Sequence, residues 1–487
     1  MANESNNFNA IIAHCKEYGY IFPSSEIYDG LSAVYDYGQN GSQLKKNIRD
    51  YWWKSMTQLQ ENIVGIDAAI FMHPLTWKAS GHIDNFSDPM IDNKDSQKRY
   101  RVDQLIESHA EKLALEGRKE EEFALLKKMD ELLAKDDFPG IKNLIEENKI
   151  TCAVSGTCNW TDIRQFNLMF DTQIGSIAGE ADKIYLRPET AQGIFVNFLN
   201  VQKSGRMKIP FGIAQTGKAF RNEIVARQFI FRMREFEQME MQFFVRPGTE
   251  MEWYKYWKAK RLEWHESLGI PAEKLRYHDH VKLAHYANAA VDIEFEFPFG
   301  FKELEGIHSR TDFDLTQHQN LSKKKLQYFD NDLKEDGKPY GNYIPYVVET
   351  SVGLDRLFLT VMSMSYAEEK WKKEDGTEDS RVVLRIPAKI APYKLAIFPL
   401  VKKDGLPEIA KQLMKDCKES FYCFYEEKDA IGKRYRRMDA IGTPFCVTID
   451  HQTKDDNTVT IRYRDTMTQE RIALKDVKKL INNMIGN

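Results

Sequence analysis

The stretch FRNEIVARQFIFRMREFEQMEM, residues 220–241, interleaves four arginines and four glutamates with phenylalanine and methionine. A charged surface helix would not place apolar residues at these intervals. We interpret residues 211–223 and 231–245 as two antiparallel strands joined by a loop at 224–230. Alternate residues of a strand face opposite sides, so the stretch predicts a β-hairpin with one apolar face and one charged face.

The charged face of this hairpin suggests a site for an anion. Arg221 and Glu223 would share a face of the first strand, and Arg232 and Arg234 a face of the second. Further along, the pattern places Met239, Met241 and Phe243 on one side and Glu240 and Gln242 on the other. Such a face is often simply solvated, but arginine is also the preferred side chain for two-pronged phosphate contacts.

The spacing of these residues resembles motif 2 of the class II aminoacyl-tRNA synthetases. The pattern is Arg221-x-Glu223, followed by Arg232-x3-Phe236-x3-Glu240. In that family the first arginine binds the α-phosphate of ATP, the phenylalanine stacks on adenine, and the glutamates fix adenine and the amino acid. The resemblance therefore implies that this stretch binds ATP.

Two further stretches resemble the other motifs of the class. VVETSVGLDRLFLTVM at 347–362 looks like motif 3, whose arginine contacts the γ-phosphate; here that residue is Arg356. The four-residue apolar period within 42–58 predicts an amphipathic helix. This helix, a predicted strand at 63–72 and Pro74 together resemble motif 1, the element that forms dimers.

Within class II, the chain resembles the homodimeric type of glycyl-tRNA synthetase over nearly its whole length. RPETAQG and FEQME are the specific parts of the match. The stretches that carry it are FPSSEIYDGLSAVYDYG (22–38), KASGHIDNFSDPM (78–90), RQFNLMF (164–170), YLRPETAQGIFVNF (185–198), FEQMEMQFF (236–244) and GKRYRRMDAIGTPFCVTID (432–450).

The resemblance implies an α+β fold with an antiparallel catalytic sheet. The catalytic domain would span 1–385, with helical insertions at about 101–150 and about 249–290, of which the first is expected to be solvated. We interpret 372–393 as a linker region. Beyond it, strands and helices alternate, which predicts a compact α/β domain at 390–487 with a largely parallel sheet. The family uses this last domain to bind the anticodon.

The family's functional residues map onto named positions of this chain. Catalytic roles fall to Arg221, Glu223 and Arg356. The ATP-binding set is Arg221, Asn222, Glu223, Phe231, Arg232, Phe236, Glu303, Leu304, Gly353, Asp355 and Arg356. The glycine-binding set is Arg101, Glu189, Phe236, Glu237, Gln238, Met239, Glu240, Glu349, Ser351 and Gly353. The tRNA-binding set is Lys433, Arg434, Arg436 and Arg437.

Glycine selection has a simple physical basis in such a site. Glycine offers an ammonium and a carboxylate but no side chain, so a pocket must select it by excluding larger amino acids. Carboxylates such as Glu189 and Glu240, together with Ser351, would hold the ammonium and fill the space that a Cβ needs. Refusing added bulk is easier than detecting its loss, so no editing domain is expected.

The implied reaction needs no nucleophile from the protein. The glycine carboxylate attacks the α-phosphorus of ATP, pyrophosphate leaves, and a terminal ribose hydroxyl of tRNA(Gly) then takes the glycyl group. Positioning and charge stabilisation suffice for this chemistry. Arg221 would hold the α-phosphate, and Arg232 and Arg356 the β/γ end. Glu303 and Glu349 would hold Mg²⁺ or ATP.

The C-terminal segment 391–487 carries a small excess of basic residues on an otherwise acidic chain. The cluster KRYRR at 433–437 has a tyrosine between its arginines, and such side chains stack on unpaired bases. On composition alone the cluster could equally be a solvated turn. The family resemblance favours a contact with tRNA.

The cysteines and termini limit the remaining possibilities. Six cysteines make no disulfide framework, and the pairs Cys152/Cys158 and Cys417/Cys423 lack zinc-ribbon spacing. We therefore expect free thiols and no structural zinc. With no transit peptide, signal sequence or membrane span expected, we predict a cytoplasmic protein that binds no membrane. The family resemblance implies a homodimer.

The sequence departs from the family pattern at a few positions, and three other interpretations are possible. Gln39 and Asn40 replace the usual Pro-Leu, and Thr350 replaces a common proline. The alternatives are another class II synthetase, an inactive synthetase-like binding protein, and an unrelated ATP-binding fold. RPETAQG argues against the first of these. The presence of Arg221, Glu223 and Arg356 argues against the second.

Overall fold

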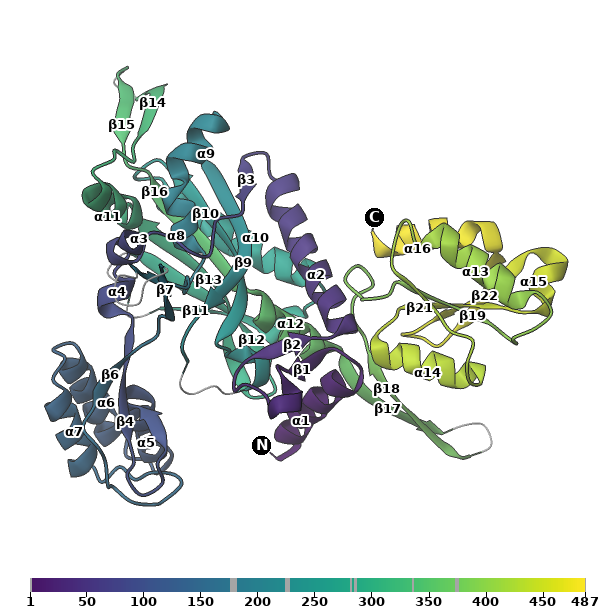
Figure 1. Ribbon diagram of the computed structural model, residues 1–487, viewed down its shortest axis with the longest axis horizontal. Helices are drawn as coiled ribbons and strands as arrows, with labels where there is room; N and C mark the ends of the chain where they lie inside the picture. Colours follow the sequence, from purple (N-terminus) through teal and green to yellow (C-terminus); the bar gives the residue numbers. More distant parts are fainter. Residues whose placement is uncertain are drawn as a thin grey trace. The chain divides into compact units, whose positions relative to one another are not determined.

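The computed structural model of the chain (Figure 1) comprises two compact units. It describes residues 2–175, 182–223, 228–280, 283, 287–334, 337–372 and 376–486. The first unit comprises Met1–Ala68, Gly193–Lys218 and Phe236–Asn487, and the second comprises Ala69–Gln192 and Ala219–Glu235.

A seven-stranded sheet forms the centre of the first unit. The strands are β3 (Ile63–Ile66), β9 (Phe211–Phe220), β10 (Glu235–Val245), β11 (Leu275–Asp279), β12 (Ala289–Phe297), β13 (Gly300–Thr311) and β16 (Tyr346–Gly353). Their order is β11-β12-β13-β16-β10-β9-β3. The pairs from β11 to β10 are antiparallel, and β3 lies parallel to β9. The predicted α+β fold with an antiparallel catalytic sheet is confirmed.

Helices cover this sheet and supply much of its core. They are α2 (Gln39–Trp53), α10 (Glu250–Ser267) and α12 (Leu354–Ser365). In α2, Leu44, Ile48 and Trp52 are fully buried, so the four-residue period marks the inward face as predicted. α10 packs against β13 and β16, and α12 packs against α2.

The predicted motif 1 elements form with shorter bounds. The helix predicted at 42–58 is α2, continued by a wider π-helical turn over Lys54–Gln58. The strand predicted at 63–72 stops after four residues as β3. Pro74 instead begins helix α3 (Pro74–Ala79), where its missing N–H has no helical partner to lose.

The two strands of the predicted hairpin are present, but both are shorter than predicted. β9 ends at Phe220 and β10 begins at Glu235, so Arg221, Glu223, Arg232 and Arg234 all lie outside the strands. A 3₁₀ turn over Phe229–Phe231 interrupts the connection. Gln228 and Phe229 have φ of 65° and 59°, which an extended ladder does not accommodate. Part of the predicted loop, 224–227, lies outside the described residues.

The second unit contains the predicted helical insertion. Its helices α5 (Val102–Leu115), α6 (Lys119–Leu133) and α7 (Phe138–Glu147) surround a shared core that includes Ile106, Ile141 and Trp160. The insertion is therefore a packed subdomain with its own interior, more ordered than the solvated helix expected from its charge. Other elements of this unit are α4 (His82–Asn85), β4 (Ser87–Asp92), β5 (Arg99–Arg101), β6 (Arg164–Asn167), β7 (Asp171–Ile174) and β8 (Asp182–Tyr185).

Two segments differ from the sequence expectation. The helical pattern expected over 249–290 holds only for α10, after which β11 and β12 belong to the central sheet. The expected linker 372–393 contains β18 (Glu378–Leu384), which forms a hairpin with β17 (Tyr366–Lys372). Other elements described before the C-terminal segment are α1 (Ala2–Glu17), β1 (Ile21–Pro23), β2 (Tyr35–Tyr37), α8 (Ala191–Val196), α9 (Phe198–Ser204), α11 (Phe313–Ser322), β14 (Tyr328–Leu333) and β15 (Pro339–Tyr343).

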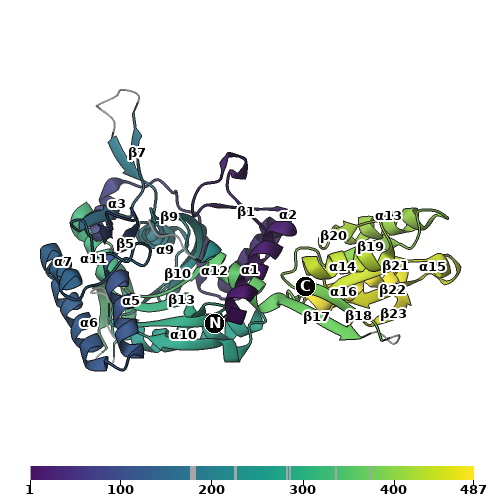
Figure 2. The same ribbon diagram turned by 90° about the horizontal axis from the view of Figure 1, so that it is seen from below.

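The C-terminal segment forms a five-stranded sheet (Figure 2), with helices on both of its faces (Figure 1). Its strands are β19 (Leu395–Pro399), β20 (Cys423–Tyr425), β21 (Phe445–Ile449), β22 (Thr458–Tyr463) and β23 (Gln469–Ala473), in the order β20-β19-β21-β22-β23. Its helices are α13 (Leu406–Cys417), α14 (Ile431–Ile441), α15 (His451–Asp456) and α16 (Val477–Ile485). Two clusters of buried residues place α13 and α16 on one face and α14 on the other.

The expectation of a largely parallel C-terminal sheet holds for only two of the four strand pairings. β19 pairs in parallel with β20 and β21, but β22 and β23 add in antiparallel fashion. The physical reason is the length of the connections, because the short α15 turn returns the chain beside β21 without a full crossover. Among all described residues, no helix is long and apolar enough to cross a bilayer.

Candidate active site

A cluster of buried polar side chains lies on one face of β10, β13 and β16. Glu349 is the register partner of both Gln242 and His308, which fixes these three side chains as neighbours. The amide Nε2 of Gln242 donates to Glu240 Oε1 at 2.7 Å and to Glu349 Oε2 at 2.6 Å. One amide thus holds two buried carboxylates in fixed positions.

Glu349 is kept ionised by two further neighbours. His308 Nδ1 lies 2.9 Å from Glu349 Oε1, and Arg310 Nη1 lies 3.2 Å from Glu349 Oε2. Burial alone would raise the pKa of Glu349, but the charge of Arg310 and the hydrogen bond from His308 outweigh it and hold the pKa well below its usual range. Arg310 is itself oriented by Asp314 at 2.8 Å.

The structure brings several predicted glycine-binding residues together around this cluster. Ser351 is the register partner of Glu240 on β10 and of Gly306 on β13. Gln238 Nε2 lies 3.4 Å from Ser351 Oγ. Met239 does not join them, because strand alternation turns its fully buried side chain toward the opposite face of β10.

Asp355 and Glu237 belong to an internal network that joins β2, α2, β10 and α12. Asp355 Oδ1 accepts from Lys45 Nζ at 2.7 Å and from the Tyr37 hydroxyl, and Oδ2 accepts from the backbone N–H of Glu237 at 2.7 Å. Glu237 in turn pairs with Arg49 at 2.8 Å and Lys45 at 3.4 Å. In the structure both carboxylates hold these segments together, and their predicted contacts with ligands stay predictions.

Arg356 leaves the start of α12 and meets β13. Its Nη1 lies 2.9 Å from Glu303 Oε2 and 3.2 Å from the Glu303 carbonyl. Both side chains reach solvent, with exposures of 24% and 51%, so this pair can open to a ligand. Leu304 is buried in the core, and its predicted ATP contact cannot involve the side chain. Gly353 precedes α12 as its N-cap, and Phe236 is half-buried near the start of β10.

The second unit carries the remaining predicted residues. Arg221 donates from Nε to the Pro188 carbonyl at 3.0 Å, with its guanidinium 5.5 Å from the Phe86 ring centre. Arg232 Nε lies 3.8 Å from Glu223 Oε2. The backbone N–H of Asn222 donates to the Leu168 carbonyl at 2.8 Å.

Arg101 and Glu189 also have partners within the second unit. Arg101 contacts Asp103 at 2.5 Å and Asp88 at 3.3 Å. Glu189 accepts from Gln192 Nε2 at 2.9 Å and lies 3.4 Å from His82 Nε2. Phe231 ends the 3₁₀ turn and is half-buried. The charged residues Arg101 and Glu189 are thus both held by partners within the second unit.

Comparison with known proteins identifies the family. Residues 394–484 match the family described as anticodon binding domain, and residues 88–124 and 114–168 match the glycyl-tRNA synthetase insertion domain 1. A glycine--tRNA ligase of Chlorobaculum tepidum is 53% identical, with 97% of this chain and 99% of the relative covered. Those of Treponema denticola and Borreliella burgdorferi are 48% and 50% identical, covering 100% and 98% of this chain and 99% and 97% of the relatives.

The chain belongs to the glycine--tRNA ligase family. The resemblance inferred from its motifs is thereby confirmed over nearly the full length. The helical segment around 101–150, which sequence periodicity marked as an insertion, lies within the insertion domain of this glycine--tRNA ligase family.

The basic cluster KRYRR at 433–437 lies on helix α14, within the segment that matches the anticodon binding domain. The alternative of a solvated turn is thus excluded. Arg434 is 2% exposed and donates to the carbonyls of Pro399 at 2.7 Å and Leu400 at 3.2 Å. Its predicted tRNA contact is corrected to a structural role, because the guanidinium serves buried backbone acceptors.

The neighbours of Arg434 on α14 are more accessible. Arg436 pairs with Asp379 at 2.8 Å and stacks on Trp371, with 4.6 Å between its Cζ and the ring centre. Arg437 pairs with Glu426 and Asp429, each at 2.9 Å. Lys433 is exposed.

Three side chains of the polar cluster were not predicted from the sequence. Gln242, His308 and Arg310 were assigned no role, although they fix Glu240 and Glu349. Gln242 is recognisable in the sequence only as the residue two after Glu240 on the same strand face. Nothing local marks His308 and Arg310, since they reach Glu349 from another strand.

Proposed function

We propose that this chain activates glycine with ATP, forming glycyl-adenylate and pyrophosphate, and then transfers the glycyl group to the 3′ end of tRNA(Gly). The observation that carries the proposal is the buried pair of carboxylates, Glu240 and Glu349, held by one amide. Buried carboxylates favour a compact cation, and the ammonium of glycine is one.

Glycine selection would rest on the crowding around this pair. Glu240 and Ser351, with the charge of Glu349 behind them, would receive the ammonium. Gly306 faces Ser351 in the register, and a Cβ at Gly306 would lie 3.1 Å from His308 Nε2. A site packed this closely leaves little room for a substrate methyl group, which favours glycine over alanine. By family resemblance, Glu189, Arg101, Gln238 and the backbone near Gly353 also contribute to glycine binding.

Adenylation would depend on arginines and a magnesium ion carried by ATP. By resemblance, Arg221 holds the α-phosphate, Arg232 and Arg356 hold the β/γ end, and Phe236 stacks on adenine. Glu223, Asn222 and Phe231 complete the ATP set. The magnesium ion neutralises triphosphate charge. Glu303 is the better candidate to hold it, because Glu349 is already occupied by Arg310, His308 and Gln242.

The broader organisation is proposed from the same resemblance. The catalytic domain would comprise 1–385 with its insertions, and 390–487 would bind the anticodon through Lys433, Arg436 and Arg437. We also propose a homodimer formed through the motif 1 helix and a cytoplasmic location. Sedimentation of the purified chain tests the dimer directly.

The decisive test is amino-acid-dependent exchange between ATP and pyrophosphate. Glycine, alanine and serine are offered separately to the full chain, with Arg221→Ala as the inactive control. Exchange with glycine alone, lost in the variant, is the expected result. Exchange with alanine or serine instead would overturn the glycine assignment, and no exchange with any of them would overturn the activity.

A further inference from the structure

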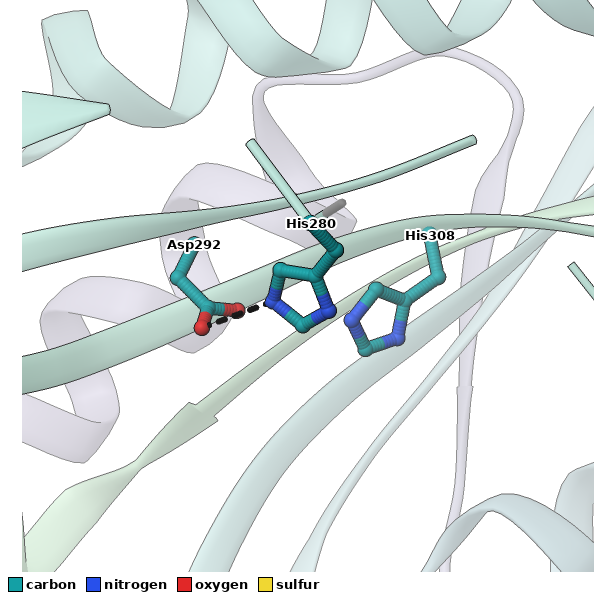
Figure 3. Close-up of side chains that lie close together, drawn as sticks. All are labelled: His280, Asp292 and His308. Carbon is teal, nitrogen blue, oxygen red and sulfur yellow. Dashed lines mark ion pairs between the residues drawn. The ribbon is translucent and has the colours of Figure 1, made fainter. Parts of the chain in front are cut away.

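Two histidines and an aspartate converge beside the polar cluster, on the side of the sheet nearer its β11 edge (Figure 3). His280 directly follows β11, Asp292 lies on β12 and His308 on β13. His280 Nε2 lies 2.9 Å from Asp292 Oδ2, and the two imidazole centres are 5.9 Å apart. One donor atom from each residue lies within 4.8 Å of the others.

The second nitrogen of His308 is already fixed by a carboxylate. Its Nδ1 contacts Glu349 Oε1 at 2.9 Å, so its Nε2 is the atom directed toward the cluster. A ring nitrogen bound to a carboxylate, with the other nitrogen left for an ion, is the usual arrangement of a metal-binding histidine.

The missing side chain at Gly306 allows His308 and Asp292 to lie close to the backbone of β13. A Cβ at this position would lie 3.1 Å from His308 Nε2 and 3.6 Å from Asp292 Oδ1. A larger residue would therefore crowd both donor atoms. His280 is exposed and the other two side chains are half-buried, which leaves a path from solvent.

We propose that His280, Asp292 and His308 bind one divalent transition-metal ion, with Zn²⁺ as the representative case. Two imidazole nitrogens and one carboxylate oxygen suit zinc or a similar metal, whereas Mg²⁺ prefers oxygen ligands alone. Three protein ligands leave a position for water, as in zinc sites that are not purely structural.

The donor atoms must shift to enclose an ion. Ligand atoms on a tetrahedral zinc at about 2.0–2.2 Å lie roughly 3.3–3.6 Å apart. The 2.9 Å contact between His280 and Asp292 must therefore open slightly, and separations of up to 4.8 Å must close through side-chain rotation.

This site differs from the cysteine-ligated structural zinc site that the sequence was tested for. The cysteine spacing argued against a structural zinc, and nothing in the histidine pattern marked these three residues, which span 28 positions from 280 to 308. Only the pairing of β11, β12 and β13 brings them together.

The test uses the full chain, stripped with EDTA and titrated with Zn²⁺ by calorimetry. Metal retained after desalting is then counted by mass spectrometry. We expect one ion per chain, with His280→Gln and Asp292→Asn each weakening affinity at least tenfold. His451→Gln is the matched control, since His451 is an exposed histidine 3.8 Å from Asp404 in the C-terminal domain, and it should bind like the unaltered chain. Circular dichroism melting verifies that the variants fold.

X-ray absorption at the zinc edge of the unaltered chain gives an independent answer, even if a variant does not fold. Nitrogen and oxygen neighbours at about 2.0–2.2 Å, without sulfur, are expected. Sulfur neighbours would assign the ion to cysteines and overturn the proposal. So would the absence of stoichiometric binding, or affinity unchanged in both variants.

Discussion

Lys45 on α2 and Asp355 on α12 form a buried ion pair, with 2.7 Å between Nζ and Oδ1. Their side chains are only 14% and 4% exposed. Asp355 also receives the Tyr37 hydroxyl and the Glu237 backbone N–H, so one carboxylate ties together segments more than 300 residues apart. Asp355, the aspartate of the GLDR sequence, thus stabilises the packing of these segments. The adjacent Arg356 faces solvent and Glu303.

Replacing Asp355→Asn should destabilise the fold by about 3–5 kcal/mol, because a buried lysine loses its main counter-charge. Urea denaturation followed by circular dichroism measures this. The matched control is Asp50→Asn, since Asp50 forms an exposed pair with Lys46 on the same helix and should contribute no more than about 0.5 kcal/mol. Equal losses of unfolding free energy in the two variants would contradict this stabilising role of Asp355.

Gln242→Leu should raise the KM for glycine in pyrophosphate exchange at least tenfold while leaving the KM for ATP little changed. The amide that separates and orients Glu240 and Glu349 is lost, and two buried carboxylates lose a donor. The unfolding free energy should also fall by about 1–3 kcal/mol. A parallel rise in both KM values would argue against a specific role at the glycine site.

Arg356→Ala should slow glycine-dependent exchange about 100-fold or more, the size expected when one charged donor to the reacting phosphates is removed. Stability should change little, because the pair with Glu303 is partly exposed. Arg385→Ala serves as control, since Arg385 forms a similarly accessible pair with Glu369. Full activity of Arg356→Ala would remove it from the proposed machinery.

Two neighbouring substitutions on α14 should separate structure from tRNA binding. Arg434→Gln should lower the melting temperature, because the Pro399, Glu426 and Leu400 carbonyls lose a shared charged donor. Lys433→Gln should leave the melting temperature unchanged but raise the KM for tRNA. Aminoacylation and thermal melting of both variants check this. The reverse pattern would restore Arg434 as a tRNA contact.

Lys394 should give the chain a distinctive pH dependence. Its side chain is buried and donates to the Lys389 and Ala391 carbonyls, and burial lowers its pKa from 10.5 to about 7. Between pH 7 and 10.5 the unfolded chain therefore binds more protons at this residue. By linkage, its contribution makes the free energy of unfolding rise with pH across that window.

Lys394→Met should remove this dependence. The free energy of unfolding of the variant minus that of the unaltered chain should be largest near pH 6.5. This difference should fall by up to about 5 kcal/mol by pH 10.5. The two carbonyls lose their donor at every pH, so only the slope of the difference is diagnostic. Denaturation curves at several pH values measure it, and parallel profiles would show that Lys394 does not titrate in this range.

Helix α2 and strands β9 and β10 could be predicted from local patterns in the sequence, whereas β11 and the start of β12 fall in a segment that was expected to be helical. The four-residue period in α2 and the alternation of Met239, Glu240, Met241 and Gln242 depend on residues close together in the chain. The same holds for the motifs that indicated the family. The ends of the hairpin could not be predicted, because the left-handed turn at Gln228 and Phe229 leaves no local mark in composition.

The sequence by itself determined the order of the motifs and, through their resemblance, the family and the fold class that the family implies, since motif spacing is a property of contiguous residues. Only the tertiary structure decided which charged groups are buried and which partners they have. Gln242, His308 and Glu349 meet through the register of three strands that are distant in the chain. Arg434 and Asp355 resemble exposed ligand contacts in the sequence, yet packing buries them, because the energy of a charge depends on neighbours that only long-range folding supplies.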